Sequence, residues 1–201
     1  MPRADFFQRL GLFAAPGFLD DDLCRRLQAA MDRGQRLDGT IGTGGAAFAV
    51  DPTYRRTKVV DVGDELRDEM RERLLACRPA VAAQYEVALS DCQRPQFLAY
   101  GPGDFYKPHR DVNPGGAATS QARRIAAVIF LNAASDTPAP GCYGGGALTF
   151  YEWLTDPAGR DVGLPLEAEP GLLITFRAEA LHAVSPVTHG ERRTIVSWFT
   201  S

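Results

Sequence analysis

The sequence predicts a mainly β protein with helices flanking it at the N-terminal end. Up to about residue 92 apolar residues recur at helical spacing, whereas from residue 93 short apolar runs alternate with turn residues, as in sandwiches and barrels. A chain of 201 residues suits one compact domain with a buried core. We therefore expect a single domain over 1–201, with a helical support region at 1–92 and a β core at 93–201.

Two helices are predicted in the support region. The first spans 20–32, where an aspartate can cap the helix and apolar residues follow at every fourth position. The second begins near Asp64, and Pro79 should end it or begin a further helix through Tyr85. Between them, the Gly-rich segment 34–54 predicts a loop with one or two short edge strands.

Six strands are predicted in the β core from apolar runs bounded by turn residues. They cover 96–100, 122–131, 146–151, 171–176, 182–184 and 193–199. Two long irregular connections, 112–121 and 132–145, interrupt them. Long loops of this kind are usually functional when they lie beside a site, so we expect both to frame the substrate entrance.

Composition excludes several classes of partner. The net charge is −3, with 45% hydrophobic and 23% charged residues, which predicts no binding of nucleic acid or anionic membranes. There is no apolar run long enough to span a bilayer, and the first residues do not resemble a secretory signal, so the cytoplasm is expected. Composition leaves the oligomeric state open.

The cysteines are scattered along the chain, which favours free and mostly buried thiols over a zinc knuckle or a redox pair. They are Cys24, Cys77, Cys92 and Cys142. Cys142 is expected to differ, because its Pro/Gly-rich loop can approach the active site.

His109, Asp111 and His182 are the residues most suggestive of chemistry. An imidazole and a carboxylate two apart on an extended segment project to the same side, and a distant strand can supply the second imidazole. Three such ligands would occupy one face of an octahedron and leave open positions, as oxygen chemistry at non-haem Fe(II) requires. The motif His-x-Asp is by itself common, so its surroundings have to support this interpretation.

Those surroundings, 97–111 and 182–193, closely resemble the Fe(II)/2-oxoglutarate-dependent oxygenases of the prolyl 4-hydroxylase-like branch. The resemblance implies a double-stranded β-helix, or jelly roll, with Fe(II) as cofactor, 2-oxoglutarate and dioxygen as cosubstrates, and ascorbate as an optional stimulant. It implies hydroxylation of an unactivated C–H bond of a small molecule or amino acid, with release of succinate and CO2. The alternative is a prolyl or other residue of a protein as the substrate.

Strand alternation places Arg192, Thr194 and Trp198 on one face of the last strand and Arg193 on the other. Both faces contain apolar residues, so alternation alone does not say which one lines the pocket. The resemblance implies that Arg192, ten residues after the second histidine, binds the far carboxylate of 2-oxoglutarate, a role that suits its forked guanidinium. Arg193 is then expected to be a solvated charge, and Trp198 to pack in the core.

Other assignments also come from the resemblance. Tyr100 resembles a tyrosine whose hydroxyl holds the cosubstrate, although it would otherwise be a half-buried strand residue. Phe130 stands where some relatives have a second such tyrosine, so that hydrogen bond is either absent or supplied from elsewhere, and Thr194 is the candidate to supply it. Tyr106 can face the substrate, and His189 is given no metal role.

Two other classes of protein stay open at this point. A jelly-roll metal-binding module without turnover could use the same scaffold, and a zinc hydrolase could use two histidines and an aspartate. Neither would need Arg192.

Overall fold

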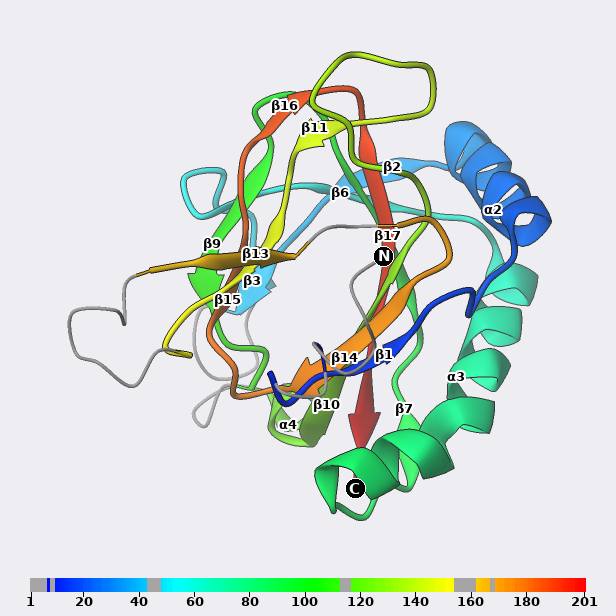
Figure 1. Cartoon of the computed structure of the whole chain (residues 1–201), viewed down its shortest axis with the longest axis vertical. Coiled ribbons are helices and arrows are strands. Elements are labelled where there is room, and N and C mark those ends of the chain that lie inside the picture. The colour runs from blue at the N-terminus through cyan, green and yellow to red at the C-terminus, as the bar shows by residue number, and fades with distance from the viewer. Residues whose placement is uncertain (1–6, 8–9, 43–47, 113–116, 154–161, 167–168) are drawn as a thin grey trace.

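The computed structural model describes residues 7, 10–42, 48–112, 117–153, 162–166 and 169–201. Two antiparallel sheets face each other, and two helices cover the outer side of the larger sheet (Figure 1). The predicted jelly roll with flanking N-terminal helices is confirmed.

The helices are α2 (Asp21–Arg33), α3 (Asp64–Tyr85) and the short α4 (Ala118–Gln121). An aspartate caps α2 as predicted, and it is Asp20, whose carboxylate accepts a hydrogen bond from the backbone N–H of Leu23 at 2.7 Å.

The expectation that Pro79 ends a helix is wrong, since α3 continues through it. A proline inside a helix costs about 3 kcal/mol. The turns beyond it are held by packing: Val81 and Tyr85 are buried, and the Tyr85 hydroxyl donates to the carbonyl of Thr175 and accepts from the backbone N–H of Phe13. Tertiary contacts therefore override the local helix-breaking preference.

The larger sheet has eight strands. In order these are β1 (Phe13–Ala15), β14 (Leu173–Arg177), β10 (Arg123–Phe130), β17 (Arg192–Thr200), β8 (Gln96–Tyr100), β6 (Lys58–Val60) and β2 (Arg36–Asp38), with β7 (Asp91–Cys92) paired to β17.

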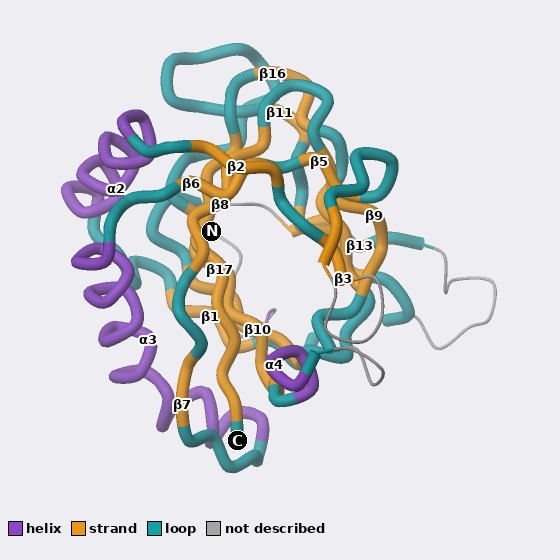
Figure 2. Tube along the Cα trace, turned by 180° about the vertical axis from the view of Figure 1, so that it is seen from behind, coloured by secondary structure: helices purple, strands orange, loops and turns teal. Residues whose placement is uncertain are grey.

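The smaller sheet has five strands and lies on the other side of the jelly roll (Figure 2). In order these are β13 (Leu164–Leu166), β12 (Leu148–Phe150), β15 (His182–Val184), β9 (Phe105–His109) and β5 (Arg55–Arg56). Two strand pairs complete the described fold, β11 (Gly144–Gly145) with β16 (Val187–His189) and β3 (Ile41–Gly42) with β4 (Phe48–Ala49).

All six predicted strands are present within two residues of their expected bounds, as β8, β10, β12, β14, β15 and β17. The segment 34–54 contains three short strands in its described part, β2, β3 and β4, where one or two were expected. The support region contributes strands to both sheets as well as helices, because β1, β2 and β6 join the larger sheet and β5 joins the smaller one.

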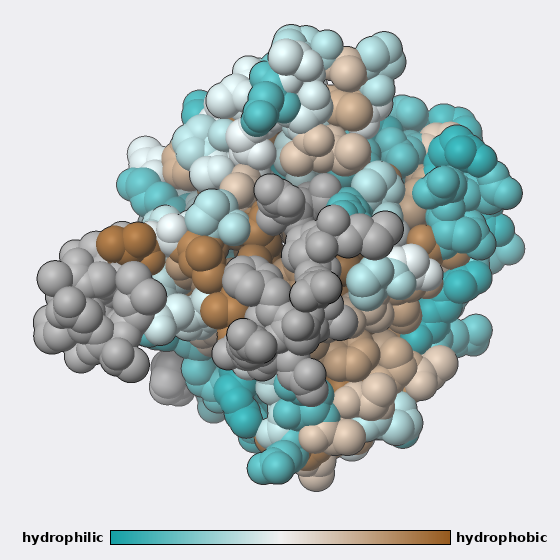
Figure 3. Space-filling model, in the orientation of Figure 1, coloured by the Kyte–Doolittle hydropathy of each residue, from teal (hydrophilic) through white to brown (hydrophobic). Residues whose placement is uncertain are grey.

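Alternation along the larger sheet divides its side chains between two cores. Phe97, Ile195 and Phe199 point outward and pack against α2 and α3, whereas Phe130 and Trp198 point inward toward the smaller sheet. The surface over α2 is largely hydrophilic (Figure 3). No helix in the described part of the chain is both long enough and apolar enough to cross a membrane.

The four cysteines are free, as predicted. Cys24 and Cys92 are buried, while Cys77 and Cys142 are partly exposed.

Candidate active site

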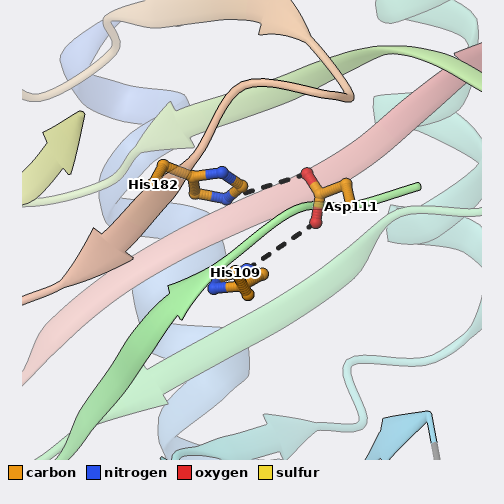
Figure 4. A group of neighbouring side chains, drawn as sticks. All are labelled: His109, Asp111 and His182. Atoms are coloured by element: carbon orange, nitrogen blue, oxygen red, sulfur yellow. Dashed lines mark ion pairs between the residues drawn. The ribbon is translucent and has the colours of Figure 1, made fainter. Parts of the chain in front are cut away.

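The structure brings His109, Asp111 and His182 together from two neighbouring strands of the smaller sheet. His109 ends β9, His182 begins β15, and the two residues pair directly in the sheet (Figure 4). The two Asp111 carboxylate oxygens lie 3.8 Å from the Nε2 atoms of His109 and His182, and the three candidate ligand atoms all lie within 4.8 Å of one another. This spacing suits three ligands of one metal ion.

Asp111 lies beyond the end of β9, and backbone contacts hold it there. The N–H groups of Asp111 and Val112 both donate to the carbonyl of Ala178, at 2.9 and 3.3 Å. Arg123 donates to the carbonyl of Asp111 at 3.2 Å. The backbone of Asp111 is thus held by contacts outside the strand ladder.

Each histidine is oriented by a carbonyl two residues before it. Nδ1 of His109 lies 2.9 Å from the oxygen of Lys107, and Nδ1 of His182 lies 3.0 Å from the oxygen of Ala180. A carbonyl can only accept, so both Nδ1 atoms carry the proton and both Nε2 atoms present a lone pair to the site.

The electrostatics of the cluster favour a cation. Burial and then the neighbouring His182 lower the pKa of His109 to about 3, so its imidazole is neutral near pH 7. Burial opposes ionisation of Asp111, but the two imidazoles outweigh it and the pKa of this carboxyl falls below its usual value. Two imidazoles and one carboxylate form a suitable donor set for Fe(II).

A bulge in β9 turns Tyr106 toward the same site. His182 pairs with His109 but Val184 pairs with Tyr106, so two residues of β9, Lys107 and Pro108, lie opposite the single Ala183 of β15. Regular alternation would put Tyr106 and His109 on opposite faces. Instead their rings stack, with centroids 3.5 Å apart and an interplanar angle of 16°. Pro108 lies within the bulge and has no N–H for the ladder.

The cluster opens into a cavity of about 540 Å³ between the two sheets. Besides the three candidate ligands, its wall includes the residues singled out from the sequence, Tyr100, Tyr106, Arg192, Thr194 and Trp198. The strand face predicted for Arg192 is therefore the face that lines the cavity.

Arg192 is 2% exposed, and its side chain is incompletely paired. Nη1 donates to the Thr194 hydroxyl at 3.2 Å, but Nε has no partner. The guanidinium carbon lies 5.3 and 5.4 Å from the ring centroids of Tyr100 and Phe130. Among the described residues no carboxylate lies within ion-pair distance of it. A buried guanidinium in this state is poised for an anionic ligand.

Gly146 leaves room for Arg192. Its φ is +60°, and a Cβ there would lie 2.9 Å from Val187 Cγ2 and 3.0 Å from Arg192 Cδ. Tyr143 borders the same space, where burial raises the pKa of its hydroxyl against the opposing effect of Arg192. The sequence did not indicate a role for Tyr143, which lies among the Gly residues of a predicted loop.

Arg193 points away from the cavity, as predicted, but it is not a solvated charge. Its side chain is 16% exposed and forms ion pairs with Asp32 of α2 at 2.6 Å and with Glu191 at 2.9 Å. The correction follows from α2, which covers this face of the sheet and brings a carboxylate to it.

Other expectations are also revised. Tyr100 is fully buried, so the alternative of a half-buried strand residue with a solvated hydroxyl is wrong. Trp198 packs in the core between the sheets and also walls the cavity. Its ring lies 3.5 Å from the guanidinium carbon of Arg123, a residue that the sequence did not single out because nothing nearby distinguishes it. Among the described residues, His189 lies outside the cluster formed by the three candidate ligands.

We expected the loop 132–145 to frame the substrate entrance, but its residues do not line the cavity. Its residues Asn132, Gly141 and Cys142 line a second hollow of about 470 Å³, together with Arg193 and residues of α2. Cys142 is therefore directed to the opposite face of the sheet. The expectation for 112–121 falls partly outside the described residues, which omit 113–116.

Comparisons with known proteins agree with this geometry. Residues 95–200 match the model of the 2OG-Fe(II) oxygenase superfamily. A PKHD-type hydroxylase of Maricaulis maris is 30% identical over 87% of this chain and 71% of its own length, and one of Klebsiella pneumoniae is 27% identical over 94% and 78%. A Pseudomonas putida prolyl-4-hydroxylase superposes with a TM-score of 0.68 at 26% identity, over 98% of this chain and 96% of that one. The chain belongs to the 2OG-Fe(II) oxygenase superfamily and is an Fe(II)- and 2-oxoglutarate-dependent hydroxylase of its prolyl 4-hydroxylase-like branch.

Proposed function

We propose that this hydroxylase acts on an amino acid, free or as a residue of a peptide. One side of its cavity binds the metal ion, and the other binds the cosubstrate. His109, Asp111 and His182 hold Fe(II), and Arg192 binds the far carboxylate of 2-oxoglutarate. The related proteins support the substrate class, since they are named as hydroxylases and one as a prolyl-4-hydroxylase.

The buried and incompletely paired guanidinium of Arg192 is the observation that carries the proposal. Neither a metal-binding module nor a zinc hydrolase requires a buried arginine without a counter-ion at this position, and such an arginine is costly to bury. A dicarboxylate that contacts the metal at one end and Arg192 at the other would satisfy both sites.

The bound Fe(II) and 2-oxoglutarate supply the oxidising chemistry, in which dioxygen is activated with release of succinate and CO2. The chain contributes position and environment. The carbonyls of Lys107 and Ala180 fix the imidazoles, while Thr194 and the rings of Tyr100 and Phe130 hold Arg192. We assign Tyr100 and Thr194 as further residues that contact the cosubstrate.

The volume of the cavity supports a substrate whose reacting part is small. About 540 Å³ is within the range of small-molecule sites and has to accommodate both 2-oxoglutarate and the reacting part of the substrate. A free amino acid fits this space, and a peptide would have to present one side chain into it.

We also propose a cytoplasmic location and one catalytic domain over 1–201. The free cysteines of the structure are consistent with a reducing compartment. The participation of β5 and β6 in the two sheets supports treating the support region and the jelly-roll core as one folding unit.

An anaerobic titration with Fe(II), with and without 2-oxoglutarate, tests the assignment. We expect a weak visible charge-transfer band that requires both, and slow formation of succinate when oxygen is admitted without a substrate. Replacement of Arg192 by Ala should weaken the band's dependence on 2-oxoglutarate and leave Fe(II) binding intact. A protein that binds Fe(II) but neither binds nor consumes 2-oxoglutarate would contradict the proposal.

A further inference from the structure

An arginine of the smaller sheet, Arg55, also lines the cavity. Arg55 belongs to β5 of the smaller sheet, pairs with Tyr106 of β9 and lines the cavity together with His109. Arg192 reaches the same cavity from the larger sheet. The cavity therefore has a guanidinium on each of its two walls.

The Arg55 side chain is held in place by its surroundings. Nη1 donates to the carbonyl of Thr40 at 2.9 Å, and the guanidinium carbon lies 4.8 Å from the centroid of the Tyr106 ring, which itself stacks on His109. Gly39 makes room for it, because a Cβ at that position would lie 2.8 Å from Nε and 3.0 Å from the guanidinium carbon. Arg55 is thus connected to a candidate metal ligand through one aromatic ring.

This arginine lacks a counter-ion within the described structure. Its Nε is buried without a hydrogen-bond partner. Two other partly buried arginines do have a carboxylate partner, Arg67 with Asp61 at 2.9 Å and Arg193 with Asp32 at 2.6 Å. A fixed guanidinium without a counter-ion beside the metal site has the properties of a binding group for an anion.

We propose that Arg55 determines substrate specificity by binding a carboxylate of the substrate. The inference rests on the function proposed above, in which the substrate is an amino acid, free or in a peptide. A carboxylate is planar and matches the fork of the guanidinium. Held by Arg55 over Tyr106, it would place the adjoining carbon skeleton near the metal ligands. The carboxylate comes either from a free amino acid or from an acidic group of a peptide.

The test compares acids with their neutral amides. The rate of succinate formation is measured with each probe added in turn. The probes are the standard L-amino acids, their carboxamides, and short prolyl peptides that carry Glu or Gln beside the proline. We expect an acid to stimulate turnover at lower concentration than its amide. The arm that responds, free amino acid or acidic peptide, identifies the source of the carboxylate.

Arg55→Gln should raise the KM for the responding acid about tenfold or more, as expected for loss of a charged hydrogen bond. The Michaelis constants for its amide and for the cosubstrate should stay unchanged. Arg56→Gln is the matched control, because Arg56 is the next residue of β5, is exposed and does not line the cavity. It should behave like the wild type.

The inference is overturned if the wild type responds to no acid, or equally to acid and amide, while it still consumes 2-oxoglutarate. It is also overturned if Arg55→Gln weakens the apparent affinity for the cosubstrate as much as that for the acid. Failure to bind or consume 2-oxoglutarate at all would instead contradict the proposed function, so the two failures are distinguishable.

Discussion

The larger and the smaller sheet each supply one half of the site, but they position their residues in different ways. On the larger sheet Arg192 and Thr194 lie two residues apart on β17, in a ladder with unbroken register to β8. On the smaller sheet Tyr106 and His109 share a face only because β9 is bulged, and Asp111 lies past the end of the strand.

This difference shows where sequence alternation is a reliable guide to a site. A regular strand transmits its period of two from sequence to structure, so one anchored residue assigns all the others. A bulge changes that correspondence locally, and a residue beyond the strand end depends on contacts from elsewhere in the chain.

Asp111→Ala should have the largest effect, since it removes one of only three protein ligands on the smaller sheet. We expect Fe(II) affinity to fall by more than the roughly 10–100-fold associated with loss of an outer hydrogen-bond partner, and turnover to be abolished. Anaerobic Fe(II) titration and succinate formation measure both. We expect similar losses of Fe(II) affinity and turnover in His109→Ala and His182→Ala. His189→Ala should change neither quantity. Loss of metal binding in His189→Ala with retention in His182→Ala would show that the second histidine is wrongly assigned.

Arg192→Ala should have the next largest effect, and Arg193→Ala provides its control on the other face of the same strand. Loss of one partner of a desolvated charge pair costs about 2–5 kcal/mol, or roughly thirtyfold or more in cosubstrate affinity. Arg193→Ala should leave that affinity nearly unchanged. The measurement is the apparent Michaelis constant for the cosubstrate, with folding checked by circular dichroism. A larger penalty at Arg193 would refute the assignment of the cosubstrate face.

Thr194→Val should have a smaller effect, because it keeps the shape of the side chain but removes the hydroxyl that accepts from Arg192. One neutral hydrogen-bond acceptor contributes about 0.5–1.5 kcal/mol, so the Michaelis constant for the cosubstrate should rise about two- to tenfold. Fe(II) affinity without 2-oxoglutarate should not change. A selective loss of Fe(II) affinity would mean that the two halves of the site are not separable.

Glu191→Gln should have the smallest effect and should act on stability. Burial opposes ionisation of Glu191, but Arg36 and Arg193 outweigh it and hold its pKa below the ordinary value. Its contribution is therefore full above about pH 4.5 and is lost as the pH falls through the lower folded pKa. We expect about 1 kcal/mol or less at neutral pH. Urea unfolding at about pH 7 and about pH 3 should show a flatter acid limb in the variant, and an unchanged limb would exclude Glu191 as a source of it.

The parts of the molecule that could be predicted from the sequence are those where local pattern and tertiary packing agree. The apolar runs around Phe97, Ile125 and Ile195 identify strands, because successive residues face opposite sides of the sheet and both sides are buried. Asp20 identifies a helix start through its capping hydrogen bond. Spacing and resemblance together identified the candidate site residues His109, Asp111, His182 and Arg192.

The parts that could not be predicted depend on contacts between distant segments. The helix continues past Pro79 because Tyr85 bonds to strands at Phe13 and Thr175, which lie 72 and 90 positions away and which no local pattern contains. Arg193 has little exposure because α2 lies over it. Arg55 and Arg123 resemble ordinary surface arginines in sequence, and only the packing of the two sheets makes them walls of a cavity.

The carbonyls that fix His109 and His182 belong to Lys107 and Ala180, each only two residues away in the same segment. The orientation of both imidazoles is therefore built into the backbone and does not depend on a bound ion. Extraction of the metal with a chelator should leave the ligand set assembled, so that Fe(II) can be removed and restored, or exchanged for a redox-inactive divalent ion, without passage through the unfolded chain.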